Sequence, residues 1–285
     1  MKIVITGGKG MLGRILQKEF AGNEITVADL PEWDITDADA FMERLEAEKP
    51  DAVIHAAAMT KVDDCESKRE AAFRLNEEGS RNVAMAAKAC GARLVAISTD
   101  YVFSGDAPKE PWAWAETDIP APKTVYGQSK LAGENMISMV MPEAAVLRIA
   151  WLYGAGGPSF VHTMVKLGAE DGPALKVVDD QRGNPTSCKA VAGAIRFLLG
   201  RPDISGVVHG TCEGIATWYE FACEIKKLVP SFKRGIIPCS TAEFPRPAPR
   251  PANSALRKSV LNRNGMRTPP WKDALAQFVR EEFRF

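Results

Sequence analysis

The first thirteen residues constrain the fold most, because a short apolar run leads directly into a row of glycines. Lys2–Thr6 is apolar enough to form a buried strand, and the pattern over Met11–Phe20 predicts a helix. Glycines at the turn between them let a pyrophosphate approach the amides at the helix N-terminus. The spacing Gly7-x-x-Gly10-x-x-Gly13 therefore predicts dinucleotide binding rather than a plain turn. The predicted phosphate-binding residues are Gly7, Gly10, Met11 and Leu12.

The same alternation of strand and helix continues to about residue 150. Strand–helix–strand repeats of this kind build a parallel sheet that helices cover on both faces. Residues 1–150 are therefore predicted to form a Rossmann-type, doubly wound α/β domain that binds NAD(P). The further predicted strands are Glu24–Ala28, Ala52–Ala56, Arg93–Ser98 and Ala145–Ile149, and the predicted helices are Asp37–Lys49 and Glu70–Cys90.

The alternation of strands and helices ends after Trp151, where the predicted segments are shorter and prolines are more frequent. The run Phe244–Pro251 is rich in proline and arginine, and we expect an ordered loop there rather than a flexible linker. Residues 151–285 are predicted to form a smaller, mainly substrate-binding subdomain, with some segments returning to the Rossmann domain. Its predicted elements are helices Lys189–Leu199, Trp218–Leu228 and Pro270–Phe283 and the strand Gly206–His209.

Residues at the ends of the second and third strands point to the cofactor. Asp29 lies about 20 positions beyond the glycines, where an acidic residue binds the adenosine ribose. Its charge would repel a 2′-phosphate, which favours NADH over NADPH; the alternative is a solvated turn aspartate. Small residues at the end of the third strand allow a ligand close approach. They are Ala56, Ala57 and Ala58, whereas the neighbouring His55 is expected to be a core residue without a catalytic role.

Tyr126 and Lys130 form the predicted catalytic pair. Four residues apart on a helix, they share one face. An ammonium beside a phenol lowers the phenol pKa, because the positive charge favours the phenolate. Such a group suits carbonyl reduction, in which an oxyanion develops and needs a proton. The pair alone is common by chance, and its position after four predicted strands is what gives it weight.

Composition narrows the classes of function. Lysine plus arginine equal aspartate plus glutamate, 36 to 36, so no basic surface for nucleic acid or an anionic membrane is expected. No apolar run is long enough to cross a bilayer. The six cysteines are scattered, which is typical of reduced thiols in a cytoplasmic protein. Three histidines argue against a histidine-based metal site or a Ser-His-Asp triad.

A long loop runs from Phe103 to Lys123 and carries Trp112 and Trp114. Irregular stretches of this length are usually functional or disordered. Because tryptophan favours burial, we expect a packed loop on the substrate side.

Four runs together resemble the dTDP-4-dehydrorhamnose reductase family of the extended short-chain dehydrogenase/reductase superfamily. They are Thr99-Asp100-Tyr101-Val102-Phe103, Tyr126-Gly127-x-Ser129-Lys130, Asp180-Gln181-x-Gly183-x-Pro185-Thr186 and Arg250-Pro251-x-Asn253-Ser254. Further matches lie in Thr6–Gly13, Asp51–Ala58 and Arg148–Tyr153, so the resemblance runs the whole length of the chain. The first, third and fourth runs together are more specific than the glycine and tyrosine motifs.

The resemblance implies NAD(P)H-dependent reduction of the C4 ketone of dTDP-4-dehydro-L-rhamnose to dTDP-L-rhamnose. Tyr126 would protonate the C4 oxygen, Lys130 would bind the nicotinamide ribose, and Thr99 would hydrogen-bond the carbonyl. Asp34 and Ile35 would border the adenine. The implied substrate-binding residues are Thr99, Asp100, Trp151, Asn184 and Arg250.

Alternatives remain open at this point. A 4-ketoreductase for another deoxysugar nucleotide fits the same motifs, and a regulatory subunit resembling the β subunit of methionine adenosyltransferase is a non-catalytic alternative. Sugar-nucleotide dehydratases carry Asp-Glu where this chain has Asp100-Tyr101, so the base for eliminating water is missing. Some family members are homodimers bridged by Mg²⁺ through glutamates. Lys189 stands where such a glutamate would lie, so Mg²⁺ is not expected here, while another homodimer stays open.

Overall fold

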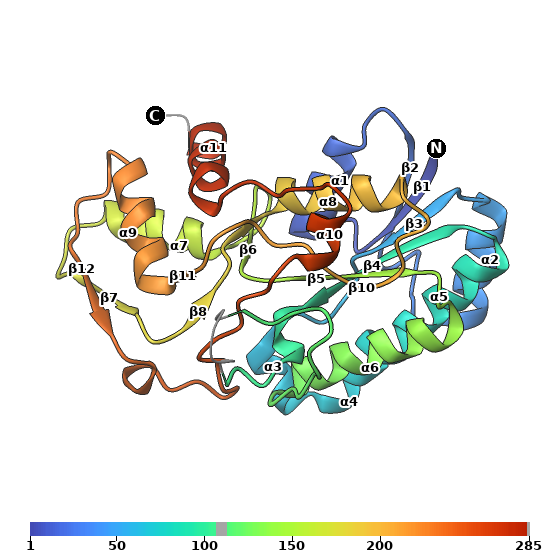
Figure 1. Ribbon diagram of the computed structural model, residues 1–285, viewed down its shortest axis with the longest axis horizontal. Helices are drawn as coiled ribbons and strands as arrows, with labels where there is room; N and C mark the ends of the chain where they lie inside the picture. Colours follow the sequence, from blue (N-terminus) through green and yellow to red (C-terminus); the bar gives the residue numbers. More distant parts are fainter. Residues whose placement is uncertain (107–112, 284–285) are drawn as a thin grey trace.

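The computed structural model describes residues 1–106 and 113–283 and confirms the doubly wound α/β fold (Figure 1). The central sheet is parallel, with the order β10-β5-β4-β3-β1-β2. The chain reverses direction across the sheet between β1 and β3, and ligands bind at such a switch point. The strands are β1 Lys2–Thr6, β2 Glu24–Ala28, β3 Ala52–His55, β4 Arg93–Thr99, β5 Ala145–Ile149 and β10 Gly206–His209.

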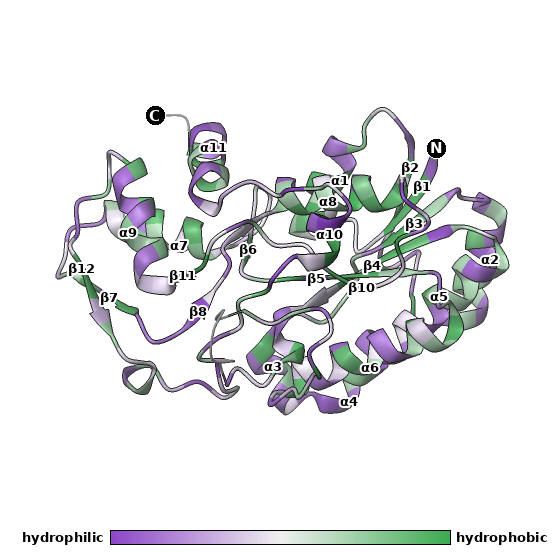
Figure 2. Cartoon of the chain, viewed as in Figure 1, coloured by the Kyte–Doolittle hydropathy of each residue, from purple (hydrophilic) through white to green (hydrophobic). Residues whose placement is uncertain are grey.

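Both faces of this sheet are covered, which explains why its strands are mostly apolar (Figure 2). Successive strand residues point to opposite faces. Ile3 and Ile5 of β1 join one core, and Val4 between them joins the other. The first core is covered by α1 (Met11–Glu19) and α8 (Cys188–Leu199). The second is covered by α2 (Ala38–Glu48), α5 (Gly79–Ala89) and α6 (Val125–Val140).

The prediction of one regular helix over Glu70–Cys90 is wrong in its middle. The chain forms α4 (Arg69–Phe73), a π-helical turn η1 (Arg74–Glu78) and then α5. A π turn shifts the phase of the side chains, and such turns are frequent at functional sites. Apolar periodicity did not reveal it, because the sequence on either side is compatible with a helix. The short helix α3 (Val62–Ser67) was also not predicted.

The C-terminal part forms a smaller unit of helices and short strand pairs beside the sheet (Figure 1). The segments α8, β10 and α10 (Ser259–Arg263) return to the Rossmann sheet, where Ile195, Val208 and Leu261 join its core. The helices of the smaller unit are α7 Phe160–Ala169, α9 Trp218–Leu228 and α11 Trp271–Phe283. The short strands pair β6 Leu152–Tyr153 with β9 Thr186–Ser187, β7 Leu175–Val178 with β12 Ile236–Cys239, and β8 Arg182–Gly183 with β11 Ala216–Thr217.

The two loops that we expect to be ordered, around Trp114 and over residues 244–251, are packed against the rest of the protein where the structure describes them. Trp114 stacks on Phe103 with ring centroids 4.7 Å apart, and its Nε1 donates to the Asn253 carbonyl at 3.1 Å. Trp112 lies outside the described residues. The proline- and arginine-rich run 244–251 is tied to the sheet side through Asp63, which accepts hydrogen bonds from the Ala248 amide and the Arg250 guanidinium.

All six cysteines are free thiols, as predicted. Within residues 1–106 and 113–283, no helix has the length and apolar character needed to cross a membrane.

Candidate active site

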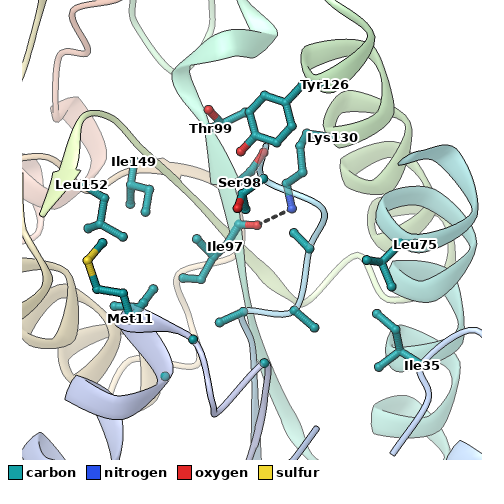
Figure 3. A pocket seen from close by; sticks show the side chains of 18 of the residues that line it. Met11, Ile35, Leu75, Ile97, Ser98, Thr99, Tyr126, Lys130, Ile149 and Leu152 are labelled. Carbon is teal, nitrogen blue, oxygen red and sulfur yellow. Dashed lines mark hydrogen bonds between the residues drawn. The ribbon is translucent and has the colours of Figure 1, made fainter. Parts of the chain in front are cut away.

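A cavity of about 660 Å³ opens along the carboxyl edge of the sheet. Parallel strands all end at this edge, so residues from distant parts of the sequence meet there. Almost every predicted site residue lines it, from the glycine-rich turn at one end to the tyrosine–lysine pair at the other (Figure 3). The predicted residues in its wall are Gly7, Gly10, Met11, Leu12, Asp29, Asp34, Ile35, Ala56, Ala57, Ala58, Thr99, Asp100, Tyr126, Lys130 and Trp151.

The glycine-rich end has room for a pyrophosphate against the start of α1. Gly7 has a positive φ of 68°, and a Cβ there would lie 2.7 Å from the Ala57 backbone. Gly10 provides no side chain to cap α1, so the first-turn amides remain available to an anion. A Cβ on Gly13 would lie 2.4 Å from the Gly7 carbonyl oxygen. This end therefore fits a dinucleotide cofactor.

Asp29 borders the cavity directly after β2 and is held by the backbone. Its Oδ2 accepts from the Lys9 amide at 2.8 Å, and its Oδ1 accepts from the Leu30 amide at 2.9 Å. Each carboxylate oxygen keeps a further acceptor site that a ribose hydroxyl could use. Lys9, which sequence reasoning did not consider, places its ammonium beside the Leu30 carbonyl and 3.8 Å from Glu32.

The predicted catalytic pair, Tyr126 and Lys130, lies on α6. Thr124 caps this helix by accepting a hydrogen bond from the Gly127 amide, which fixes the first turn that carries Tyr126. Lys130 donates from Nζ to the Ile97 carbonyl of β4 at 2.8 Å (Figure 3). Tyr126 and Thr99 face each other at the same end of the cavity. The structure thus brings the three predicted catalytic residues together.

The expectation that the Tyr126 pKa is lowered is wrong. Burial raises the pKa of Tyr126 above its usual value, and the nearby Thr99 hydroxyl opposes this only in part. Lys130 is itself buried, and desolvation lowers its pKa to about 8. Burial was not foreseen from the spacing of the two residues alone. Tyr126 therefore stays protonated around neutral pH, which is the form that a proton donor needs.

The active-site helix is clamped on two sides. Arg148 of β5 binds Glu134 of α6 through two hydrogen bonds, of 2.9 and 2.6 Å, and both side chains are buried. On the other side, Asn76 of the π turn donates to Ser129 at 2.9 Å and accepts from the Met59 amide at 2.8 Å. Asn76 was missed by sequence reasoning, because a buried asparagine in a helical stretch gives no local signal.

Asp100 is a buried carboxyl directly behind Thr99. Its Oδ1 accepts from the Thr99 hydroxyl at 3.0 Å, and the Asp100 side chain is almost fully shielded from solvent. Burial raises its pKa to about 6, although the Ser254 and Thr99 hydroxyls and nearby amides favour the charged form. Asp100 can therefore change its protonation state close to neutral pH.

Trp151 projects into the cavity from a strained backbone. Its φ is +45°, a conformation that is rare for a bulky residue and common at functional sites. The ring stacks on Trp218 of α9 with centroids 3.6 Å apart and planes within 6°. Trp218 in turn donates from Nε1 to Gln181 at 3.1 Å. Trp218 was not predicted as a site residue, because in the sequence it is simply the first residue of a helix, with no motif around it.

Two predicted substrate residues lie outside this cavity. Asn184 is buried, and its amide group is used by the backbone, donating to Gly214 at 2.6 Å and accepting from Leu256 at 2.7 Å. That arrangement joins loops, and the role of Asn184 in binding substrate stays a prediction. Arg250 binds Asp63 through two hydrogen bonds of 3.0 and 2.8 Å. Its predicted role at the diphosphate requires it to leave Asp63 or to bind phosphate with its remaining donors.

Lys189 and His55 both have partners. Lys189 donates to the two carboxylate oxygens of Glu281 at 2.8 and 2.7 Å. Among residues 1–106 and 113–283, no group of three or more His, Cys, Asp or Glu side chains is arranged to hold a metal ion. His55 contacts Thr6 and Ser80, and burial lowers its pKa to about 3, so it is a neutral core residue as expected.

Comparison with known proteins extends the similarity over the whole chain. The family model described as the RmlD substrate binding domain matches residues 1–283. A probable dTDP-4,6-dihydroxy-2-methyloxan-3-one 4-ketoreductase from Streptomyces antibioticus is 41% identical, covering 97% of this chain and 94% of its own. A crystal structure of a dTDP-4-dehydrorhamnose reductase from Clostridium acetobutylicum superposes with a TM-score of 0.94 and 41% identity, covering 99% of both chains. The reductase of that name from Bacillus anthracis, solved in complex with NADP, gives 0.93 and 37%, covering 98% of this chain and 99% of its own.

Proposed function

Since this chain belongs to the dTDP-4-dehydrorhamnose reductase family, we propose that it reduces the C4 ketone of dTDP-4-dehydro-L-rhamnose to dTDP-L-rhamnose. One observation carries the proposal: Thr99, Tyr126 and Lys130 stand at one end of a cavity whose other end fits a dinucleotide. A ketone held between the two ends would lie next to a proton donor and within reach of a nicotinamide.

The residues of this chain would position the ketone and supply its proton. A bound reduced nicotinamide cofactor supplies the hydride for C4. Tyr126, kept protonated by its burial, donates its phenolic proton to the oxygen that gains charge. Lys130 is held by the Ile97 carbonyl at the place where a nicotinamide ribose is expected, and Thr99 lies at the same end of the cavity as Tyr126, where it would face the ketone oxygen. The buried surroundings strengthen both interactions.

We propose that the enzyme accepts NADH at least as well as NADPH. Asp29 is fixed at the cavity border and would repel a 2′-phosphate, which supports NADH. The Lys9 ammonium beside the same turn would attract that phosphate, which supports some use of NADPH. The Bacillus anthracis relative was solved with NADP. Both cofactors are therefore expected to work, and Asp29 is expected to set their ratio.

A second candidate within the same chemistry is a 4-ketoreductase for another deoxysugar nucleotide. The Streptomyces antibioticus relative, with a different named substrate, is as similar to this chain as the rhamnose-pathway structure from Clostridium acetobutylicum. The regulatory-subunit alternative loses support, because the catalytic set is intact and lines an open cavity.

We place the enzyme in the cytoplasm, because all six cysteines are free thiols and reduced thiols are typical of that compartment. We expect no Mg²⁺ bridge between subunits, since the Lys189 ammonium forms an ion pair with the Glu281 carboxylate. A homodimer of another kind remains compatible with the fold.

The deciding experiment measures NADH and NADPH oxidation by the purified protein with dTDP-4-dehydro-L-rhamnose, and identifies the product by NMR. We expect one cofactor oxidised for each dTDP-L-rhamnose formed. The C4 epimer as product, or oxidation only with other keto sugars, would favour the second candidate. Cofactor binding without oxidation of any keto-sugar nucleotide would contradict the assignment as a reductase.

A further inference from the structure

The Thr99 hydroxyl already has hydrogen-bond partners within the protein, and they conflict with its proposed role as a donor to the ketone oxygen. A threonine hydroxyl has one proton to donate and two lone pairs to accept with. Its proton goes to Asp100 Oδ1 at 3.0 Å, and one lone pair accepts from the Tyr101 amide at 3.2 Å. The remaining lone pair of Thr99 is left for the cavity side, where the Tyr126 hydroxyl lies beside it, and a lone pair opposite an oxyanion repels that oxyanion.

This arrangement holds as long as Asp100 is ionised, because a carboxylate can only accept hydrogen bonds. Once protonated, the Asp100 carboxyl can donate to the Thr99 oxygen instead. Thr99 then keeps its own proton for the cavity side, where the ketone oxygen would lie next to Tyr126. The charge state of Asp100 thus decides whether Thr99 accepts or donates at the reacting oxygen.

We propose that Asp100 is a positioning residue that works in its neutral form and turns the Thr99 hydroxyl into a second donor to the ketone oxygen. The inference rests on the proposed reductase function and adds to it a residue that controls the direction of one hydrogen bond. The Asp100 proton stays on Asp100 during turnover. The ketone gains hydride from the cofactor and its proton from Tyr126, so no further co-reactant is needed.

The surroundings of Asp100 favour the neutral form. Its Oδ2 is buried and has no hydrogen-bond partner in the described part of the chain, and burial outweighs the nearby Ser254 hydroxyl, which favours the charged form. A buried carboxylate oxygen without a partner disfavours ionisation. The titratable groups that face Asp100 are Tyr101 and Tyr126, and neither carries a positive charge. Arg250 acts on Tyr101 but is neutralised by Asp63.

The direction of the pH dependence follows from the raised pKa. The Asp100 proton is present below about pH 6 and is lost as the pH rises through that value. For the wild-type protein, kcat/KM should therefore fall as the pH rises from 5.5 to 7, by up to about tenfold per pH unit, until the activity of the ionised form is reached. Any further fall near pH 8 would belong to Lys130. A bound keto sugar would move this fall to higher pH, because it adds a second group that needs the Thr99 proton.

The test is Asp100→Asn, because an amide can donate to Thr99 permanently. We expect this variant to lose the fall in kcat/KM between pH 5.5 and 7, below the range in which Lys130 loses its charge, and to equal or exceed the wild type at pH 7. In a Thr99→Val background the same change should have no effect on the profile. Asp171→Asn, at an exposed position, is the matched control and should keep the wild-type profile. A variant that keeps the fall, or that folds normally but is more than about 100-fold slower at pH 5.5, would overturn the proposal.

A measurement without substrate separates this inference from the proposed function. The ¹³C chemical shift of the Asp100 carboxyl, assigned by its loss in Asp100→Asn, should titrate near pH 6. A titration below pH 4 would overturn the role of Asp100 even if the protein reduces the keto sugar. A titration near pH 6 in a protein that reduces no keto sugar would instead count against the reductase assignment.

Discussion

The two ends of the cavity are built in different ways. The cofactor end comes mostly from backbone and small residues of short, continuous segments such as Gly7–Gly13 and Ala56–Ala58. The substrate end comes from side chains that distant segments bring together, such as Trp151 against Trp218. Backbone recognition depends on the local sequence, whereas the substrate end depends on how the second unit packs on the first.

The charge of the two ends differs as well. At the cofactor end, Asp29 lies at the rim, where the Lys9 and Leu30 backbone amides support its charge. At the substrate end, Tyr126, Lys130 and Asp100 are buried, and burial moves the pKa of each towards the neutral form. The cofactor end is thus suited to binding charged groups, and the substrate end is suited to moving a proton.

The largest effect that the comparison predicts belongs to the substrate end. Tyr126→Phe removes the proposed proton donor but keeps the ring that packs in the wall, so kcat should fall by about 10² to 10⁴. The dissociation constant of NADH, measured by fluorescence titration, should change little. A variant that binds NADH normally and reduces the sugar at the wild-type rate would remove Tyr126 from the chemistry.

The substitution that should most weaken cofactor binding at the other end is Gly13→Ala. The new Cβ would lie 2.4 Å from the Gly7 carbonyl oxygen, and neither backbone can move without distorting the turn. Overpacking of this kind costs about 1–3 kcal/mol. If that cost falls on the bound conformation, NADH affinity should weaken roughly 10- to 100-fold. Gly22→Ala is the matched control, because a Cβ there has no neighbour within 4 Å; equal losses in both variants would contradict the role of the turn.

The difference between the ends also explains what the sequence could predict. The strands, the glycine-rich turn, Asp29 and the Tyr126–Lys130 pair are each encoded within a few residues, and the structure places the last three at the cavity. Asn76 and Trp218 act only through partners far away in sequence, and no local pattern marks them. Asn184 belongs to a matching motif, yet the motif could not show that its amide faces the backbone.

Besides contacts between residues that are distant in sequence, local patterns also failed to predict how deeply the site residues are buried. Spacing alone predicted that Lys130 lowers the Tyr126 pKa, but the opposite shift results from the loss of solvent around both groups. The pKa of a site residue depends on how much of the chain covers it, which only the folded structure shows.

A smaller effect is expected from the charge at the cofactor rim. Asp29→Ala removes two acceptors for the ribose hydroxyls and the repulsion of a 2′-phosphate. Affinity for NADH should fall by about tenfold, since hydrogen bonds to a charged group contribute roughly 1.5 kcal/mol or more. NADPH should lose less or gain, with Lys9 beside the turn. The measurement is the ratio of kcat/KM for the two cofactors, and an unchanged ratio would place Asp29 outside the ribose site.

The smallest effect tests the tryptophan stack. Trp151 has a strained backbone that costs about 1–3 kcal/mol, and the stack with Trp218 is a contact that holds it in place. An aromatic pair contributes roughly 0.5–1.5 kcal/mol, so Trp218→Ala should raise the KM for the sugar nucleotide about threefold to tenfold. The KM for NADH should stay the same, because Trp218 lies behind the substrate end. Trp218→Phe keeps a ring against Trp151 and should retain most of the affinity. If instead the alanine variant raised both KM values equally, the stack would support the whole cavity, and the division into two independently built ends would be wrong.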